Sequence, residues 1–363
     1  MKKLRVVLLF GGRSSEHSIS CATAGGVLRA IDRDRYDVIP VGITRDGAFV
    51  LEADDPERFA LDPVHLPEVV DNGTRVCWPE SAASRELRVS DAAGERSLGD
   101  IDVVFPILHG RFGEDGTVQG LFELVGLPYV GNGVLASAIG MDKHVTKTVL
   151  EGAGIQVAPW VTLTRAALAA EPDLWARRVR ALGLPAFVKP ARAGSSVGVT
   201  KVADWSELDA ALEVAFAEDR TVLVESGVVG REIECGVLEG RSAGDVRVSV
   251  AGEVVVTGRE FYDFDAKYLD APGVELICPA DLGEGELFEL QRIARRAFEA
   301  IGGEGLARVD VFLSDEGYVV NEVNTMPGFT PISMFPTCWL NSGLSYPELI
   351  DELIEVGYAR GSR

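Results

Sequence analysis

The sequence predicts a multidomain α/β protein in which an N-terminal parallel-sheet domain is followed by α+β units. Residues 4–10, 15–31 and 38–43 read as strand, helix and strand, which is how a parallel sheet begins. Later segments alternate short strands with helices and contain no internal repeat. The length of 363 residues exceeds what one small core holds, so two or three domains are expected.

The elements of the first domain each have a local reason in the sequence. Residues 4–10 form an apolar run that ends at a glycine pair, as expected of a buried strand and its turn. The helix of residues 15–31 would be capped by Ser14 or Ser15. Another buried strand covers 101–108, with a helix at 116–125 and a short strand near Tyr129. Residues 52–100 are polar and weakly periodic, which predicts an irregular elaboration with short strands.

The remaining two thirds of the chain contain a small α+β unit and a larger one. In the small unit we expect helices at 141–152 and 205–218 and strands at 157–162, 186–189, 197–202 and 222–225. In the larger unit we expect helices at 286–300 and 346–356 and a hairpin between 308 and 324. The predicted domains are 1–138, 139–227 and 228–363.

Composition excludes several classes of protein. A formal charge of −21 without a basic stripe argues against nucleic acid and against anionic membrane surfaces. No apolar stretch approaches the length of a membrane span. Five scattered cysteines, never in a Cys-x-x-Cys pair, support neither a disulfide framework nor a zinc site. We therefore expect reduced thiols and a cytoplasmic location.

The hairpin between 308 and 324 alternates apolar and polar residues with period two. Arg308 and Asp310 share a face of one strand, and Glu322 and Asn324 share a face of the other. Oxygen-bearing side chains beside a fixed cation are how Mg²⁺ is held against a phosphate. The alternative is a solvent-facing strand pair with ordinary charges.

Seven of the 35 basic residues are lysines and the other 28 are arginines, so the lysines that remain suggest phosphate binding. Lys189 ends an apolar strand just before a Gly-Ser-Ser-Val-Gly segment at 194–198, whose backbone N–H groups could bind an anion. A simple turn is the alternative. The strand ending at Glu225, with Glu232 shortly after it, could read adenine and ribose, or could be a surface ion-pair loop.

Two further segments are ambiguous on their own. Residues 261–268 mix aromatic, acidic and lysine residues, which is typical of a lid loop but also of an aromatic patch on the core. Glu16 and His17 lie in the first turn of the first helix, where a glutamate often only interacts with the helix dipole.

Taken together, these segments resemble the D-alanine:D-alanine ligases of the ATP-grasp superfamily. The resemblance covers most of the chain apart from residues 52–100. In family order the matching segments are Gly11-Gly12-x-Ser14-x-Glu16-His17, His109-Gly110-x-x-Gly113-Glu114-Asp115-Gly116, Met141-Asp142-Lys143, Lys189-Pro190 with 194–198, Lys267-Tyr268, Arg308-x-Asp310 and Glu322-x-Asn324-Thr-x-Pro327-Gly328.

The resemblance implies a fold, a reaction and its cofactors. The fold would be a Rossmann-like N-terminal domain followed by a two-part ATP-grasp unit. ATP would phosphorylate one D-alanine, and the amine of a second would attack the acyl phosphate to give D-alanyl-D-alanine for peptidoglycan. Two Mg²⁺ ions, for which Mn²⁺ can substitute, and a homodimer are also implied.

The resemblance also implies a role for each matched residue. Metal would be bound by Asp310, Glu322 and Asn324. ATP would be bound by Lys143, Lys189, Ser195, Ser196, Glu225, Val228, Glu232, Phe261, Lys267, Phe312, Asn321 and Glu322. The two amino acid substrates would be bound by Glu16, His109, Arg308, Gly328 and Ser333. Catalysis would involve Arg308 and the Gly328 N–H as an oxyanion site, and a hydrogen-bonded set of Glu16, Ser195 and Tyr268.

Two alternatives stay open at this point. A ligase that joins D-alanine to D-lactate or D-serine would share the same chemistry, although Tyr268 resembles the dipeptide-forming members. A catalytically silent nucleotide-binding protein should lose its substrate-side groups, whereas Glu16, Arg308 and Ser333 are all present.

Overall fold

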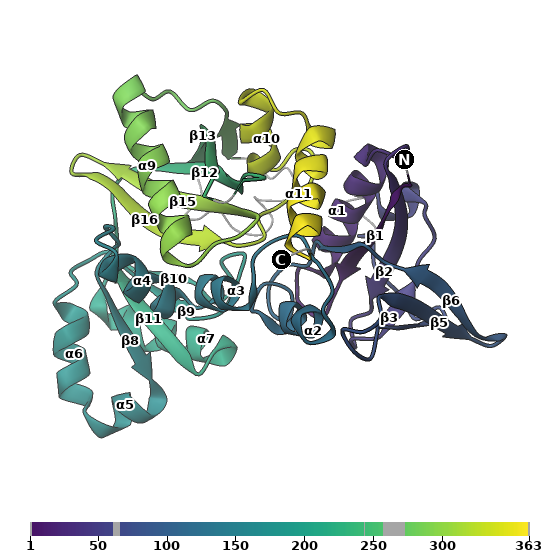
Figure 1. The fold of residues 1–363 in the computed structure, drawn as a ribbon. Helices are drawn as coiled ribbons and strands as arrows, with labels where there is room; N and C mark the ends of the chain where they lie inside the picture. The colour runs from purple at the N-terminus through teal and green to yellow at the C-terminus, as the bar shows by residue number, and fades with distance from the viewer. Residues whose placement is uncertain (1, 61–65, 243, 257–272, 362–363) are drawn as a thin grey trace.

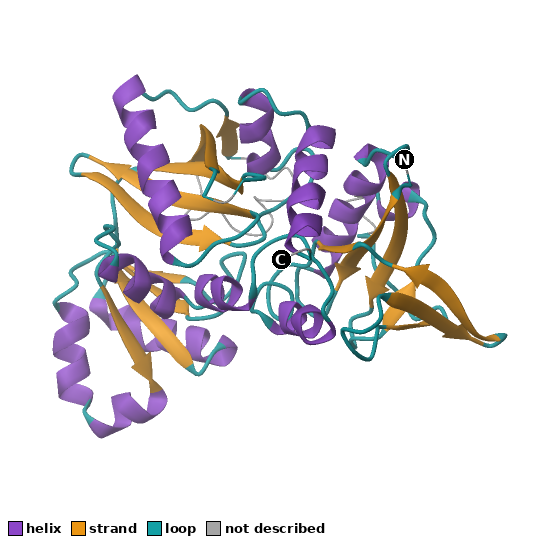
Figure 2. Cartoon of the chain, viewed as in Figure 1, coloured by secondary structure: helices purple, strands orange, loops and turns teal. Residues whose placement is uncertain are grey.

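The structure is a computed structural model that describes residues 2–60, 66–242, 244–256 and 273–361. Within these residues the chain forms four β-sheets with helices packed against them (Figure 1; Figure 2). The predicted α/β class is confirmed. Of the helices described, none has both the length and the apolar character needed to cross a bilayer.

The first sheet has the strand order β3-β2-β1-β7. Strands β1 (Leu4–Gly11), β2 (Tyr36–Ile43) and β7 (Val103–Pro106) are parallel, and β3 (Phe49–Leu51) is antiparallel to β2. Helix α1 (His17–Ala30) connects β1 to β2, as the sequence predicts. Helix α2 (Thr117–Val125) follows the glycine-rich loop after β7.

Residues 52–100 are more regular than expected. They contain the short helix η1 (Pro56–Phe59) and an antiparallel sheet formed by β4 (Arg75–Cys77), β5 (Glu86–Asp91) and β6 (Gly94–Asp100). Leu87 and Val89 of this sheet are fully buried in the same core as Val7 and Leu9 of β1. The small sheet is therefore anchored to the first one.

The middle of the chain forms an antiparallel sheet of order β10-β9-β11-β8. Its strands are β8 (Trp160–Thr164), β9 (Ala186–Pro190), β10 (Thr200–Val202) and β11 (Thr221–Ser226). The helices of this region are α3 (Val134–Met141), α4 (Lys143–Gly152), α5 (Arg165–Ala170), α6 (Pro172–Arg180), η2 (Trp205–Glu207) and α7 (Leu208–Glu218). Helices α3, α5 and α6 are not predicted by the sequence analysis.

The last sheet is antiparallel, with the order β14-β13-β12-β15-β16. Its strands are β12 (Arg231–Glu239), β13 (Val246–Val256), β14 (Val274–Ile277), β15 (Leu306–Ser314) and β16 (Gly317–Asn324). The helices of this region are α9 (Glu284–Ala300), α10 (Met334–Asn341) and α11 (Tyr346–Arg360). The predicted hairpin is β15–β16, in which Arg308 lies opposite Asn324 and Asp310 opposite Glu322.

The C-terminal helix packs against the N-terminal sheet. Ile350 and Leu353 of α11 share one buried core with Val6 and Leu8 of β1, and Figure 1 shows α11 beside α1. The segment between β16 and α10 is therefore drawn towards the carboxyl end of β1. Ligands of parallel sheets bind at such ends.

The start of α1 differs from the expectation. Its N-cap is Glu16, whose side chain makes no capping hydrogen bond, rather than Ser14 or Ser15. The Ser14 hydroxyl accepts a hydrogen bond from the Glu16 N–H at 3.2 Å, one step before the helix. The helix therefore begins at His17, two residues later than predicted.

Candidate active site

The largest collection of candidate residues lines one cavity of about 450 Å³. It lies between the start of α1, the sheet that contains β9 and β11, and the β15–β16 hairpin. Every described candidate lines this cavity except Asp310 and Ser333. Phe261, Lys267 and Tyr268 lie outside the described residues. A cavity of this size suits a nucleotide-sized ligand.

Arg308 and Asp310 form a bidentate ion pair beneath the wall of the cavity. Nε and Nη2 of Arg308 donate to the two Asp310 oxygens, each at 2.7 Å. Glu234 on β12 adds a carboxylate oxygen 3.1 Å from Nε. Burial lowers the pKa of Arg308, but the charges of Asp310 and Glu234 outweigh burial and raise it well above its usual value. The guanidinium is therefore a fixed positive charge.

Asp310 stands in a row of carboxylates that crosses the sheet. Glu234 lies opposite it on β12 and Glu322 lies opposite it on β16. Burial and these neighbouring charges raise the pKa of Asp310 to about 7, although Arg308 opposes the rise. Asn324 completes the cluster by donating its Nδ2 hydrogen to Asp310 at 2.9 Å. Such crowding of acidic groups is relieved by a cation.

The donor atoms at this place fit a magnesium ion that also binds phosphate. Asp310, Glu322 and Asn324 supply carboxylate and amide oxygens, the hard ligands that Mg²⁺ prefers. Among the described residues, no three His, Cys, Asp or Glu side chains are arranged to hold a metal alone.

A second buried charge cluster surrounds Glu225 at the end of β11. Lys189 approaches one Glu225 oxygen at 2.7 Å and Lys147 approaches the other at 3.4 Å. Burial would raise the pKa of Glu225, but the two ammonium groups together lower it. Lys147 is only 2% exposed. The carboxylate is thus held ionised at the floor of the cavity.

The glycine-serine loop after β9, residues 194–198, reaches across to the start of α1. Ser195 and Ser196 both have left-handed backbone angles, with φ of 49° and 58°, which are uncommon for serine. The Ser195 hydroxyl donates to Glu16 Oε1 at 2.5 Å. Two members of the predicted set Glu16, Ser195 and Tyr268 are therefore in direct contact.

His109 and Glu114 form the wall of the cavity beside Glu16. Glu114 is partly buried and accepts hydrogen bonds from the N–H groups of Gly110 at 2.5 Å and Met326 at 3.2 Å. Burial, with the charge of Glu16, raises the pKa of Glu114 to about 8. His109 Nδ1 lies 3.2 Å from the Met326 carbonyl, and within the described residues its buried Nε2 has no partner. Nε2 is thus available to a ligand.

Comparison with known proteins identifies the family. Residues 5–132 match the family model described as D-ala D-ala ligase N-terminus, and residues 149–355 match the one described as D-ala D-ala ligase C-terminus. The chain belongs to the D-Ala D-Ala ligase family. It is 51% identical over 362 residues to the D-alanine–D-alanine ligase of Arthrobacter sp. FB24, covering 99% of this chain and 95% of that one. It is 52% identical over 367 residues to the ligase of Kineococcus radiotolerans, covering 99% and 97%.

Solved structures of family members have the same fold. The D-alanine-D-alanine ligase from Coxiella burnetii superposes with a TM-score of 0.83 at 36% identity, covering 100% of this chain and 96% of that one. The VanG D-Ala:D-Ser ligase from Enterococcus faecalis gives the same TM-score at 34% identity, covering 98% and 100%. Similarity of fold therefore does not separate the two acceptors.

Three residues of the site in this ligase-family chain have no predicted role: Glu114, Lys147 and Glu234. Glu114 belongs to the quoted His-Gly segment but received no role. Lys147 is one of the few lysines and lies one helical turn after Lys143, which was a usable signal. Glu234 follows Glu232 by two positions on one strand, so period-two spacing could have found it.

Ser333 lies at a different place from the other candidates. It is the N-cap of α10, and its hydroxyl lies 2.7 Å from the Thr330 hydroxyl. Its predicted contact with the second substrate stays a prediction.

Proposed function

We propose that this chain is an ATP-dependent ligase that joins two D-alanines into D-alanyl-D-alanine through a D-alanyl phosphate, for peptidoglycan synthesis. The observation that carries the proposal is the single cavity that brings together Glu16, Lys143 and Arg308 from three distant parts of the chain. Nearly full-length relatives of 51% and 52% identity that carry this name support it.

ATP is assigned to the part of the cavity nearest β9 and β11. Lys143, Lys189, Ser195 and Ser196 bind its phosphates, since these side chains and the loop N–H groups supply positive charge and donors. The adenine and ribose are assigned to Glu225, Val228, Glu232, Phe312 and Asn321, all of which line the cavity. Phe261 and Lys267 are also assigned to ATP binding, on the family resemblance alone.

The metal assignment is two Mg²⁺ ions, for which Mn²⁺ can substitute, held by Asp310, Glu322 and Asn324. When bound, the ions neutralise the phosphate charge that develops during phosphoryl transfer. The chain contributes an arginine beside this site that keeps Asp310 oriented by two hydrogen bonds.

The amino acid substrates are assigned to the side of the cavity nearest α1. The Glu16 carboxylate binds the ammonium group of the first D-alanine, and His109 Nε2 accepts a hydrogen bond beside it. Arg308 and the Gly328 N–H stabilise the oxyanion of the tetrahedral intermediate, because a fixed cation lowers the energy of developing negative charge. Ser333 binds the carboxylate of the second D-alanine, and Tyr268 closes the set with Glu16 and Ser195.

The sheet boundaries support a division into domains at 1–138, 139–227 and 228–363, which we propose together with a homodimeric assembly and a cytoplasmic location. The division leaves α11 in the third domain although it packs on the first sheet. Truncation before α11 should therefore destabilise the first domain as well.

The test is phosphate release from ATP with single and paired substrates. D-alanine alone should support turnover, whereas L-alanine should not. D-serine and D-lactate are offered together with D-alanine, because the similarity to a D-Ala:D-Ser ligase makes these acceptors the second candidate function. Turnover that ignores D-alanine would refute the proposal, and a faster rate with D-serine or D-lactate would move it to the second candidate.

A further inference from the structure

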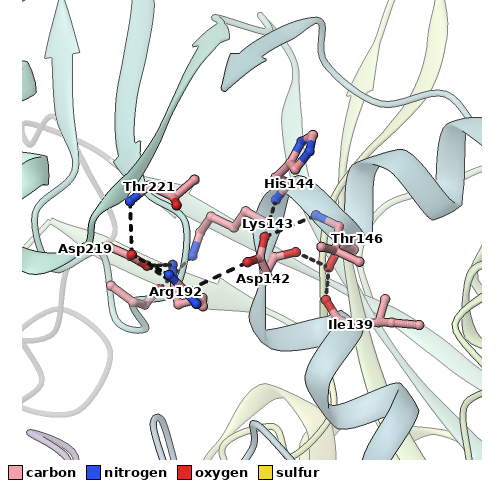
Figure 3. Close-up of polar contacts among 10 residues, drawn as sticks. Ile139, Asp142, Lys143, His144, Thr146, Arg192, Asp219 and Thr221 are labelled. Carbon is pink, nitrogen blue, oxygen red and sulfur yellow. Dashed lines mark hydrogen bonds and ion pairs between the residues drawn. The ribbon is translucent and has the colours of Figure 1, made fainter. Parts of the chain in front are cut away.

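Next to the glycine-serine loop, Arg192 and Asp219 are joined by three hydrogen bonds, which we call the Arg192–Asp219 lock (Figure 3). Nε and Nη2 of Arg192 donate to Asp219 at 2.9 and 2.7 Å, and the Arg192 backbone N–H donates to the same carboxylate at 3.0 Å. Asp219 also accepts the Thr221 N–H at 3.1 Å. One nearly buried carboxylate therefore fixes the start of the loop and the start of β11.

The lock continues to the helix that carries Lys143. Nε of Arg192 lies 3.8 Å from Asp142, whose side chain caps α4 by accepting the N–H groups of His144 at 3.1 Å and Val145 at 3.2 Å. Figure 3 shows Arg192 between Asp219 and Asp142, with Lys143 adjacent. The start of α4 is thus tied by charge to the loop.

Lys143 is also bound to the residues on both sides of Arg192. Its backbone N–H donates to the Ala191 carbonyl at 3.0 Å, and its Nζ donates to the Ala193 carbonyl at 2.7 Å. A displacement of Arg192 would therefore move both acceptors of Lys143. Ala193 and Lys143 line the ATP cavity, whereas Arg192, Asp142 and Asp219 line a separate groove.

The loop needs such support for a physical reason. Ser195 and Ser196 hold left-handed backbone angles that serine disfavours, and such angles persist only where surrounding contacts enforce them. A bidentate arginine–carboxylate pair is a suitable restraint, because its planar geometry fixes direction as well as distance.

We propose that Arg192 and Asp219 are positioning residues that hold Lys143 and the glycine-serine loop in place for the phosphates of ATP. The inference rests on the assignment of ATP to this cavity. Neither residue touches the nucleotide; each acts through the backbone and side chain of its neighbours.

The test is steady-state kinetics of Arg192→Ala and Asp219→Asn. We expect the KM for ATP to rise about tenfold, with kcat at saturating ATP changing little. The KM for ATP of the double variant should equal that of the more impaired single variant, because both substitutions break the same ion pair. Arg192→Lys retains the positive charge but cannot donate two parallel hydrogen bonds to Asp219, so its KM for ATP should be intermediate. This variant also serves as the probe if Arg192→Ala does not fold.

The matched control is Arg165→Ala. Arg165 makes a similar bidentate pair with Glu213, at 2.6 and 2.8 Å, in the same part of the chain but away from the cavity. A KM for ATP in the Arg192 variants equal to that of Arg165→Ala would overturn the proposal, as would a lower melting temperature with unchanged KM. Lys143→Ala separates the two assignments: if it leaves the KM for ATP unchanged, the phosphate assignment itself falls, and the positioning role falls with it.

Discussion

The hydroxyl of Ser195 donates a hydrogen bond to Glu16 across 179 positions of sequence. Glu16 stands at the start of α1, and Ser195 stands in the loop after β9. This contact connects the side of the cavity that we assign to the amino acids with the side that we assign to the phosphates. It gives a direct means of testing whether the two sides act together.

Ser195→Ala should lower kcat/KM for D-alanine by about 10- to 100-fold, the value of a hydrogen bond to a charged group. Alanine keeps the size of the residue and removes only the hydroxyl. Ser206→Ala, in η2 and not among the residues that line the cavity, is the control. Ser195→Gly tests the backbone, because glycine relieves the left-handed angle without restoring the bond. Full activity of Ser195→Ala, measured by phosphate release, would contradict the coupling.

Arg308→Lys should lower kcat by about 100-fold or more, because lysine cannot bind Asp310 with two parallel hydrogen bonds and offers a displaced charge to the oxyanion. Binding of ATP, followed by thermal stabilisation, should persist. Arg231→Lys is the matched control, because Arg231 on β12 also forms a bidentate ion pair, with Glu253 at 2.8 and 2.6 Å. Equal kcat in the two variants would exclude the oxyanion role.

Lys147→Met should reduce both stability and ATP binding. The substitution leaves Glu225 buried with Lys189 alone, at a cost of about 1–3 kcal/mol for a poorly satisfied buried group. Thermal melting with and without ATP measures both effects. Lys201→Met, on β10 outside the cavity, is the control and should change neither stability nor ATP binding. If ATP raises the melting temperature of Lys147→Met as much as that of the wild type, Glu225 needs only Lys189.

The stability of the ligand-free protein should fall as pH rises through the range set by Glu114. Burial raises the pKa of Glu114 from 4.5 to about 8, so between these values the folded state binds a proton that the unfolded state has lost. The folded state therefore loses stability as pH increases there, by about 1.4 kcal/mol for each pH unit. Glu114→Gln should have a flatter dependence of melting temperature on pH. An equally steep dependence in the variant would assign the effect to other groups.

The sequence predicted the local geometry of the site better than its contacts. Alternation with period two placed Arg308, Asp310, Glu322 and Asn324 on one side of a hairpin, and the register of β15 and β16 is as that pattern requires. The helix cap was predicted wrongly. The residue before α1 is Glu16, whose carboxylate accepts a hydrogen bond from Ser195, a partner that no local pattern contains.

Sequence alone determined the strands, the loop and the types of charge, since side-chain periodicity and turn chemistry are local properties. Tertiary structure decided which charges meet. Glu234 comes to lie 3.1 Å from Arg308 because β12 pairs with β15, and Lys147 of α4 reaches Glu225 of β11, which is distant in the sequence. Such contacts depend on how sheets and helices pack over long sequence separations, and burial then sets the pKa of each group. The reading of Arg308 as a cation beside a metal site is thereby extended: it is a guanidinium held by two carboxylates from two strands.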